Sequence, residues 1–297
     1  MADGDYTVVQ HDCRQYMFEM LQDGVRPNLI IADPPYNIGQ DYADYQDRMR
    51  EEEFLLFMHE WLDAAFDVLD DNGSMWVIVP DEFADDIGVY CKRSLGMHRR
   101  GWIVWFYTFG QNCRNKFNRS HVHLLYMTKK KPLKRKLKKD EKPPFTFNAD
   151  AVKVPSARQL KYNDKRAKSG GKVPDDVWVL LKDDIEELLD PVGDSWSESR
   201  ICGTFKERKS VSPNQIPVPI LSRIVTACSN PGDLVLDPFT GTGSTGEACV
   251  IHGRRFIGID VSEACVEATK ERIDNAVGVA SAKAKAEKEQ MELFPKN

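Results

Sequence analysis

The sequence predicts an α/β fold in which helices cover both faces of a doubly wound, mostly parallel β-sheet. Three observations support this prediction. Short apolar, β-prone runs recur along the chain, helical patterns separate them, and two of the runs end in motifs rich in Pro or Gly. The runs expected to form strands are residues 6–10, 28–32, 74–79, 234–237 and 255–259.

Helical patterns stand between these runs. Residues 51–69 carry their apolar side chains on one side of an expected helix, and further helices are expected at 14–21, 81–94, 220–229, after Gly246 and after Ser262. The runs 101–109 and 121–127 follow each other and are joined by a polar, basic connection. This arrangement predicts an antiparallel pair at the edge of the sheet.

Composition narrows the class of protein. The chain has 297 residues, 41% of them hydrophobic, and no apolar run approaches the length of a membrane span. The acidic start of the chain lacks the apolar core of a signal peptide. Its seven cysteines form no Cys-x-x-Cys pair, so we expect a reducing cytoplasm and neither a zinc site nor a disulfide framework.

Charge is distributed unevenly along the chain. The net charge is -5, yet residues 129–172 contain sixteen Lys and Arg against four Asp and Glu, a local balance of +12. Phe145, Phe147 and Tyr162 lie among these cations. One interpretation is a solvated charge run or a disordered linker. The other is a surface that contacts phosphates and stacks on bases.

The motif Asp33-Pro34-Pro35-Tyr36 directly follows the apolar run that ends at Ala32. Open α/β sheets bind ligands at the carboxyl ends of their strands, where this motif would lie. The two prolines lack N–H donors and leave carbonyl groups available as acceptors. Acceptors beside an aromatic ring suit the exocyclic amino group of a planar base, although the motif alone could be a simple turn.

A glycine-rich loop follows a second strand. Gly241-x-Gly243-x-x-Gly246 precedes an expected helix, and Asp260 comes nineteen residues after Gly241, which satisfies the dinucleotide fingerprint of an NAD-dependent dehydrogenase. Too little chain follows for the rest of a dinucleotide sheet, and Asp237 before the loop would repel a pyrophosphate. A cofactor with an adenosine ribose, an amino group and no phosphate fits better, and S-adenosyl-L-methionine has these features.

Together the two motifs resemble the β class of amino-group DNA methyltransferases, which carry Asp-Pro-Pro-Tyr early and Asp-Pro-Phe-x-Gly-x-Gly late, on either side of a basic insertion. The resemblance implies a circularly permuted class I methyltransferase (Rossmann-like) fold with an antiparallel edge strand. It implies a catalytic half at 1–128, a target recognition insertion at 129–210, a cofactor-binding half at 211–275 and an exposed tail at 276–297. Ser212 and Ile216 replace the His and Lys of one family element, and His123 replaces a Glu.

The resemblance also implies the roles of individual residues. Asp33, Pro34, Pro35 and Tyr36 would be catalytic, with Asp33 and the Pro34 carbonyl accepting hydrogen bonds from the target amine and Tyr36 stacking on a flipped base. The cofactor residues would be Asp12, Cys13, Pro213, Gln215, Asp237, Pro238, Phe239, Thr240, Gly241, Gly243, Ser244, Thr245, Asp260 and Val261. The DNA contacts would be Lys134, Arg135, Lys136, Lys138, Lys139, Arg158, Lys161 and Arg166.

The expected activity is methyl transfer from S-adenosyl-L-methionine to the N6 amine of adenine in double-stranded DNA. Cytosine N4 is the alternative, and Asp rather than Ser before Pro-Pro-Tyr favours adenine within this family. Carbon-5 methylation needs a Pro-Cys pair that the chain lacks. A catalytically inactive DNA-binding relative is a further alternative. The resemblance also admits a homodimer and a cognate restriction endonuclease as partners, and it includes no metal and no membrane.

Overall fold

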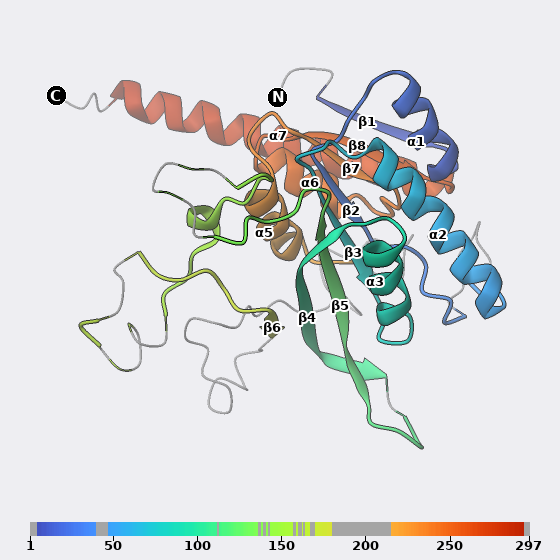
Figure 1. Ribbon diagram of the computed structural model, residues 1–297. Helices are drawn as coiled ribbons and strands as arrows, with labels where there is room; N and C mark the ends of the chain where they lie inside the picture. The colour runs from blue at the N-terminus through green and yellow to red at the C-terminus, as the bar shows by residue number, and fades with distance from the viewer. Residues whose placement is uncertain are drawn as a thin grey trace.

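The computed structural model describes residues 5–39, 47–111, 113–135, 138, 141, 143–156, 159, 162, 164–166, 170–179 and 215–293. A central mixed sheet is covered by helices on both faces, which confirms the predicted α/β architecture (Figure 1). Within the described residues, no helix combines the length and the apolar character needed to cross a membrane.

The sheet has eight strands in the order β1-β8-β7-β2-β3-β5-β4-β6. Its strands are β1 (Tyr6–Gln10), β2 (Leu29–Ala32), β3 (Ser74–Val79), β4 (His98–Gln111), β5 (Arg119–Thr128), β6 (Val177–Val179), β7 (Leu234–Asp237) and β8 (Arg255–Asp260). All neighbours are parallel except at β5, which runs antiparallel to both β3 and β4.

Among the described residues, three helices cover one face of the sheet and three cover the other. The first group is α1 (Cys13–Gln22), α2 (Glu51–Val68) and α3 (Ala84–Arg93), and the second is α5 (Val218–Cys228), α6 (Ser244–Ile251) and α7 (Glu263–Leu293), with a short 3-10 turn η1 (Ala149–Val152) beside α5. Alternate residues of β2 show the division: Ile30 and Ala32 pack with α2, whereas Ile31 packs with the core of α5.

Strand β2 pairs with β7 although some two hundred residues separate them. Leu29 is opposite Val235 and Ile30 is opposite Leu236, and the Asn28 side chain accepts a hydrogen bond from the Leu234 N–H. Both strands run in the same direction, so the segments that follow them leave the sheet at the same edge. The chain therefore brings its two motifs together through main-chain pairing alone.

Local chemistry accounts for the helix starts. The Asp12 side chain accepts a hydrogen bond from the Arg14 N–H and caps α1. Helix α2 begins with Glu51, Glu52 and Glu53, whose negative charges suit a helix N-terminus. Pro219 lies in the first turn of α5, as expected, where its missing N–H costs no hydrogen bond.

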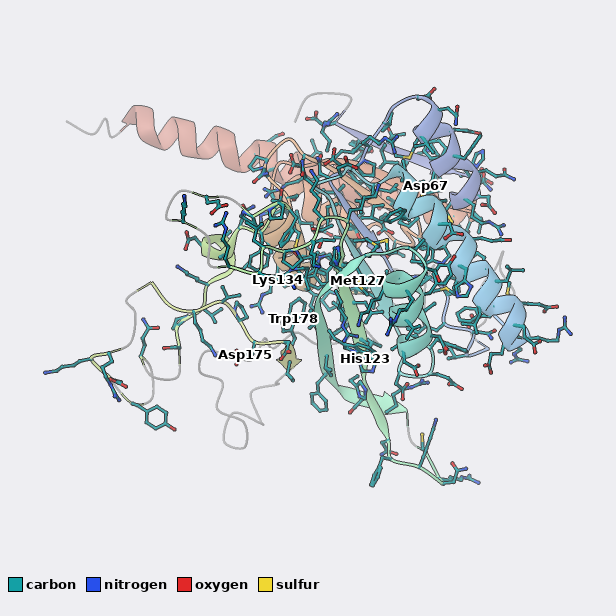
Figure 2. All side chains as sticks on the ribbon, in the orientation of Figure 1. Asp67, His123, Met127, Lys134, Asp175 and Trp178 are labelled. Atoms are coloured by element: carbon teal, nitrogen blue, oxygen red, sulfur yellow. The ribbon has the colours of Figure 1, made fainter. Side chains whose placement is uncertain are left out.

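Two features differ from the prediction. The edge strand is β6, parallel to β4, so the antiparallel pair lies one strand inside the edge. Trp178 of β6 is only 5% exposed and stacks near Trp76, which explains why this short segment joins the sheet (Figure 2). The second is that residues 276–293, expected only to form an exposed tail, continue helix α7, because Ala, Lys and Glu are strong helix formers.

Candidate active site

A cavity of about 580 Å³ opens between the ends of β2 and β7, within the usual size range for small-ligand sites. The strand order reverses at this point of the sheet, which is where open α/β proteins bind ligands. The cavity contains sixteen of the predicted residues: Asp12, Cys13, Asp33, Pro34, Pro35, Tyr36, Gln215, Asp237, Pro238, Phe239, Thr240, Gly241, Ser244, Thr245, Asp260 and Val261.

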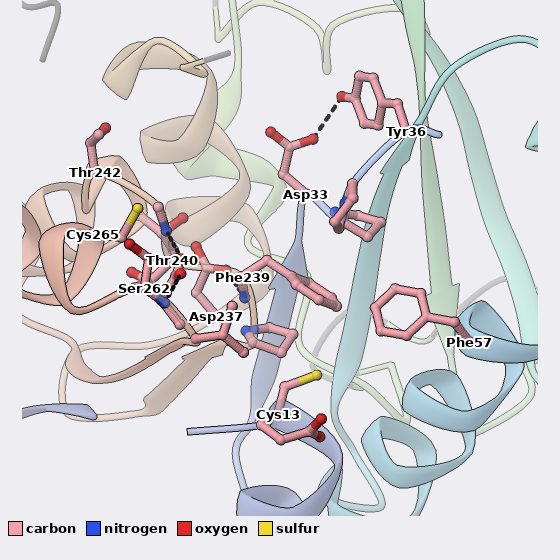
Figure 3. A pocket seen from close by; sticks show the side chains of 18 of the residues that line it. Cys13, Asp33, Tyr36, Phe57, Asp237, Phe239, Thr240, Thr242, Ser262 and Cys265 are labelled. Carbon is pink, nitrogen blue, oxygen red and sulfur yellow. Dashed lines mark hydrogen bonds between the residues drawn. The ribbon is translucent and has the colours of Figure 1, made fainter. Parts of the chain in front are cut away.

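The Asp33 carboxylate and the Tyr36 ring lie together at one end of this cavity (Figure 3). The Tyr36 hydroxyl donates a hydrogen bond of 2.6 Å to Asp33 Oδ1. A carboxylate has about four acceptor positions on its two oxygens, so this bond leaves Asp33 able to accept from a further donor. Behind them, Asn37 exchanges amide hydrogen bonds with the backbone of Met49 and holds the start of the following segment.

Asp237 is the buried carboxyl of the site. It accepts hydrogen bonds from the Phe239 N–H and the Thr245 hydroxyl. Burial, with a smaller contribution from the negative charges of Asp33 and Asp260, outweighs the opposing effect of the two hydrogen bonds and raises the pKa of Asp237 to about 7. Asp33, Asp237 and Asp260 thus line one cavity together, and a positively charged ligand would relieve the repulsion among their carboxyl groups.

The glycine-rich loop forms a tight turn between β7 and α6. Gly241 has a φ of 53°, and its N–H donates a 2.9 Å hydrogen bond to Asp260 Oδ2. Asp260 Oδ1 accepts from the Ser262 N–H at 2.9 Å, so the carboxylate at the end of β8 is held by main chain on both oxygens. Thr240 lines the cavity and is 5% exposed, and its buried hydroxyl oxygen has no hydrogen-bond partner among the described residues.

Gly243 has a packing role that the sequence did not predict. It is absent from the residues that line the cavity, has a φ of 81°, and starts α6. A Cβ atom at this position would lie 2.9 Å from the Cα of Thr269 in α7. Gly243 therefore allows α6 and α7 to approach closely, and its expected contact with the cofactor stays a prediction.

The end of β1 supplies a charged network. Arg14 donates to both oxygens of Asp12 and to Glu60 of α2, and its guanidinium lies over the Phe57 ring. These hydrogen bonds from Arg14 lower the pKa of Asp12, which keeps it ionised. Burial raises the pKa of the Cys13 thiol to about 12 and makes it unreactive.

Sequence reasoning missed the contribution of α2. Glu53, Leu56, Phe57 and Glu60 line the cavity from a helix that was expected only to pack in the core. Leu56 is 59% exposed, and Phe57 sits outside the buried stripe that faces the sheet. Apolar residues outside the stripe of an amphipathic helix were the available signal. Phe57 meets Phe239 edge-on, with ring centroids 6.2 Å apart.

Comparison with known proteins identifies the family. A family model described as DNA methylase, of the N6/N4 type, matches residues 28–271. The chain belongs to this DNA methylase family. The chain is 33% identical over 248 residues to the type II methyltransferase M.HpaI of Haemophilus parainfluenzae, covering 84% of this chain and 68% of that one. It is 30% identical over 257 residues to the DNA adenine methyltransferase YhdJ of Escherichia coli K12, covering 84% and 76%.

The fold of this DNA methylase also matches solved structures. A putative DNA modification methylase of Thermus thermophilus, complexed with S-adenosyl-L-methionine, aligns with a TM-score of 0.56 at 20% identity, covering 92% of this chain and 95% of that one. The predicted class I methyltransferase fold is thus confirmed, and the family's methyl donor is S-adenosyl-L-methionine. The chain is a DNA methyltransferase, and the dehydrogenase alternative is wrong.

The residues of the cavity fit this cofactor. S-adenosyl-L-methionine carries a sulfonium and an ammonium, and the cavity presents the carboxyl groups of Asp33, Asp237 and Asp260. The Thr240 hydroxyl offers a donor and an acceptor in a buried position, with no partner in the part of the chain that the structure describes. Within the described residues, no group of three His, Cys, Asp or Glu side chains is arranged to hold a metal ion.

Of the basic residues expected to contact DNA, the four that the structure describes (Lys134, Arg135, Lys138 and Arg166) are not part of the cavity lining. Lys134 and Lys138 are exposed (Figure 2 labels Lys134). Arg135 pairs with Glu141, and Arg166 pairs with Asp164, so both arginines are partly neutralised within their own segment. Lys136, Lys139, Arg158 and Lys161 lie outside the described residues, as does Pro213 of the expected cofactor set.

Proposed function

We propose that the chain methylates the N6 amine of adenine at specific sites in double-stranded DNA. The observation that carries this proposal is the convergence of Asp33 and Asp237 on one cavity, from strands that pair across the switch point of the sheet. A target amine could enter at the Asp33 end while the methyl donor is held at the Asp237 end. The DNA adenine methyltransferase YhdJ is among the relatives, which favours adenine.

In this proposal, Asp33 and the Pro34 carbonyl accept hydrogen bonds from the two N–H groups of the target amine. Those bonds draw the nitrogen towards tetrahedral geometry, so its lone pair becomes available to attack. The charge of Asp33 stabilises the positive charge that develops on the nitrogen. Tyr36 would exchange its hydrogen bond with Asp33 for a position against the entering base, and its ring would stack there.

The cofactor when bound supplies an electrophilic methyl group on sulfur. Asp237 and Thr240 would hold the methionine part, and Asp260 would accept hydrogen bonds from the ribose hydroxyls. Asp12, Cys13, Phe57 and Phe239 would enclose the adenine at the far end. Gln215 and Val261 line the same cavity and would complete the enclosure. Excluding water here strengthens each charge interaction and aligns the methyl group with the attacking nitrogen.

A base inside a duplex cannot reach a cavity at the sheet edge, so the target base must flip out of the stack, at a cost of a few kcal/mol. We propose that basic residues of segment 129–210 hold the DNA backbone while the base is extruded. Part of that segment belongs to the core instead, since Phe145, Val152 and Trp178 are buried. We also propose a cytoplasmic enzyme with a cognate restriction endonuclease, as the name of M.HpaI as a type II methyltransferase suggests.

The decisive experiment incubates the protein with S-adenosyl-L-methionine labelled on the methyl group and with genomic DNA of mixed sequence. Digestion to nucleosides then separates the labelled products. Label in N6-methyl-2′-deoxyadenosine supports the proposal. Label in N4-methyl-2′-deoxycytidine would show that cytosine is the target of the same mechanism, and label in neither would refute methyl transfer to DNA by this chain.

A further inference from the structure

We propose that the tip of the β4–β5 hairpin is a wedge that enters the DNA base stack, with Phe117 as the inserted ring. This inference rests on the proposed function, since it assigns to the hairpin the unstacking that base flipping needs. The hairpin is the most prominent projection of the sheet in Figure 1. Phe117 at its tip is 99% exposed.

The position of the hairpin relative to the cavity is fixed by the sheet. Strand β5 runs antiparallel to β3, so β5 begins at the edge where β2 and β3 end. Asp33 follows β2 at that edge, and the tip of the hairpin extends beyond the same edge. A duplex lying across this edge would touch the cavity and the hairpin together.

The hairpin is long enough to reach the bases through the major groove of DNA. The β3–β5 ladder ends where Val79 is opposite His123, and the β4–β5 pairing continues outward to Gln111 opposite Arg119. The four residues of β5 from Arg119 to Val122 extend the hairpin roughly 13 Å past the end of β3, and the loop 113–118 lies beyond them. The major groove is about 8.5 Å deep and admits a two-stranded ribbon, so the tip can reach the level of the bases.

The hairpin is also held rather than loosely attached. Arg119, at the outer end of the β4–β5 pairing, forms an ion pair of 2.8 Å with Asp81, two residues after the end of β3. The Asn118 side chain accepts a hydrogen bond of 2.9 Å from the Cys113 N–H and closes the tip loop. Trp102 of β4 donates to His123 of β5 at 2.8 Å, and this His stands where the family usually has Glu. These contacts hold the hairpin and its tip loop in place, and Phe117 remains fully exposed within that loop.

The charges around Phe117 favour DNA as the partner over a second protein. Residues 107–119 contain Arg114, Lys116 and Arg119 and no acidic residue. Cations beside an exposed aromatic ring provide phosphate contacts and a stacking surface in the same short loop. Proteins that kink or unstack DNA commonly insert an apolar side chain such as Phe between base steps.

The test compares five proteins on the same plasmid DNA: wild type, Phe117→Ala, Phe117→Trp, Phe18→Ala and a double variant with Arg114→Ala and Lys116→Ala. Phe18 is a matched control, because it is an exposed Phe (61%) on α1 and outside the cavity lining. Single-turnover methyl transfer is measured with saturating protein. Permanganate, which oxidises unstacked thymines, reports base-pair opening in the same complexes. Affinity is measured as a function of salt.

We expect Phe117→Ala to slow transfer about ten- to hundred-fold and to reduce permanganate reactivity, since it removes the wedge that offsets unstacking. Its salt dependence of affinity should match the wild type, whereas a double change of Arg114 and Lys116 to Ala should lower that slope by roughly 0.9 per lost phosphate contact. Phe117→Trp and Phe18→Ala should stay within about threefold of wild type.

Three outcomes would overturn the wedge. Transfer and permanganate reactivity unchanged in Phe117→Ala would show that the ring does not unstack DNA, while methylation by the wild type would leave the proposed function intact. A change in oligomeric state instead of a change in transfer would make Phe117 a contact between proteins. Absence of transfer by the wild type would refute both proposals.

Discussion

Asp237 gives the sharpest prediction, because its charge should control cofactor affinity near neutral pH. Burial raises its pKa to about 7, with further contributions from the charges of Asp33 and Asp260. A cationic ligand binds the ionised carboxylate, so its apparent Kd is multiplied by one plus the ratio of protonated to ionised Asp237. With a pKa of about 7, that factor is about 2 at pH 7, about 11 at pH 6 and about 100 at pH 5.

Affinity for S-adenosyl-L-methionine should therefore fall about fivefold from pH 7 to pH 6 and about fiftyfold from pH 7 to pH 5. Calorimetric titration in buffers of different ionisation enthalpy should detect release of about 0.9 proton per ligand at pH 6 and about 0.5 at pH 7. The Asp237→Asn variant should bind more weakly and lose this pH dependence. Asp12→Asn is the matched control, because the pKa of Asp12 is lowered and it does not titrate in this range.

The reasoning fails if the wild type binds the cofactor equally well from pH 5 to pH 7. It also fails if Asp237→Asn keeps the pH dependence of the wild type, since another group would then be responsible.

Four further predictions address other parts of the account. Asp33→Ala should bind the cofactor with a Kd within about threefold of wild type, yet its rate of methyl transfer should fall roughly 10²–10³-fold, because it removes one preorganised electrostatic group. An unchanged rate would exclude Asp33 from catalysis. Changing Lys134, Arg135 and Lys136 together to Ala should weaken DNA binding and flatten the dependence of affinity on salt concentration, whereas Lys92→Ala on the exposed side of α3 should do neither. An unaltered salt dependence in the triple variant would show that these three residues are solvated surface. Phe57→Ala should weaken cofactor binding about tenfold by removing the ring that meets Phe239, while Phe18→Ala should not; equal affinities would exclude Phe57 from the site. The pKa of Asp237 is higher in the folded chain than the ordinary 3.8, so its contribution to stability is present below pH 4 and is lost as pH rises to about 7. At pH 8 and without cofactor, Asp237→Asn should therefore increase the free energy of unfolding by at most ~4 kcal/mol and raise the Tm. A lower Tm of Asp237→Asn at pH 8 would contradict the raised pKa.

The sequence predicted the meeting of the two motifs because parallel strands present their carboxyl ends at one edge. Asp33 and Asp237 each follow a short apolar run, and that pattern is enough to place them at the same edge. Sixteen candidate site residues accordingly line one cavity. Their individual roles stay predictions, because side-chain positions around a ligand depend on the ligand.

Other features could not be read from pattern alone. The role of Gly243 depends on its contact with Thr269 of α7, and no local pattern reveals a packing partner 26 residues away. The periodic apolar stripe of α2 predicts only which residues face the core, and Phe57 lies outside that stripe, so its place in the cavity lining could not be predicted. Strand β6 consists of Val177–Val179 only, too short to show a period of two, and it is held by the burial of Trp178. The Tyr36–Asp33 hydrogen bond depends on side-chain geometry that sequence spacing does not determine.

The most direct test of the central claim is a crystal structure of the protein with S-adenosyl-L-methionine bound. The account predicts that the ammonium group lies against Asp237, that the ribose hydroxyls face Asp260, and that the methyl group points along the cavity towards Asp33. Density for the cofactor at another position, or a methyl group directed away from Asp33, would contradict it.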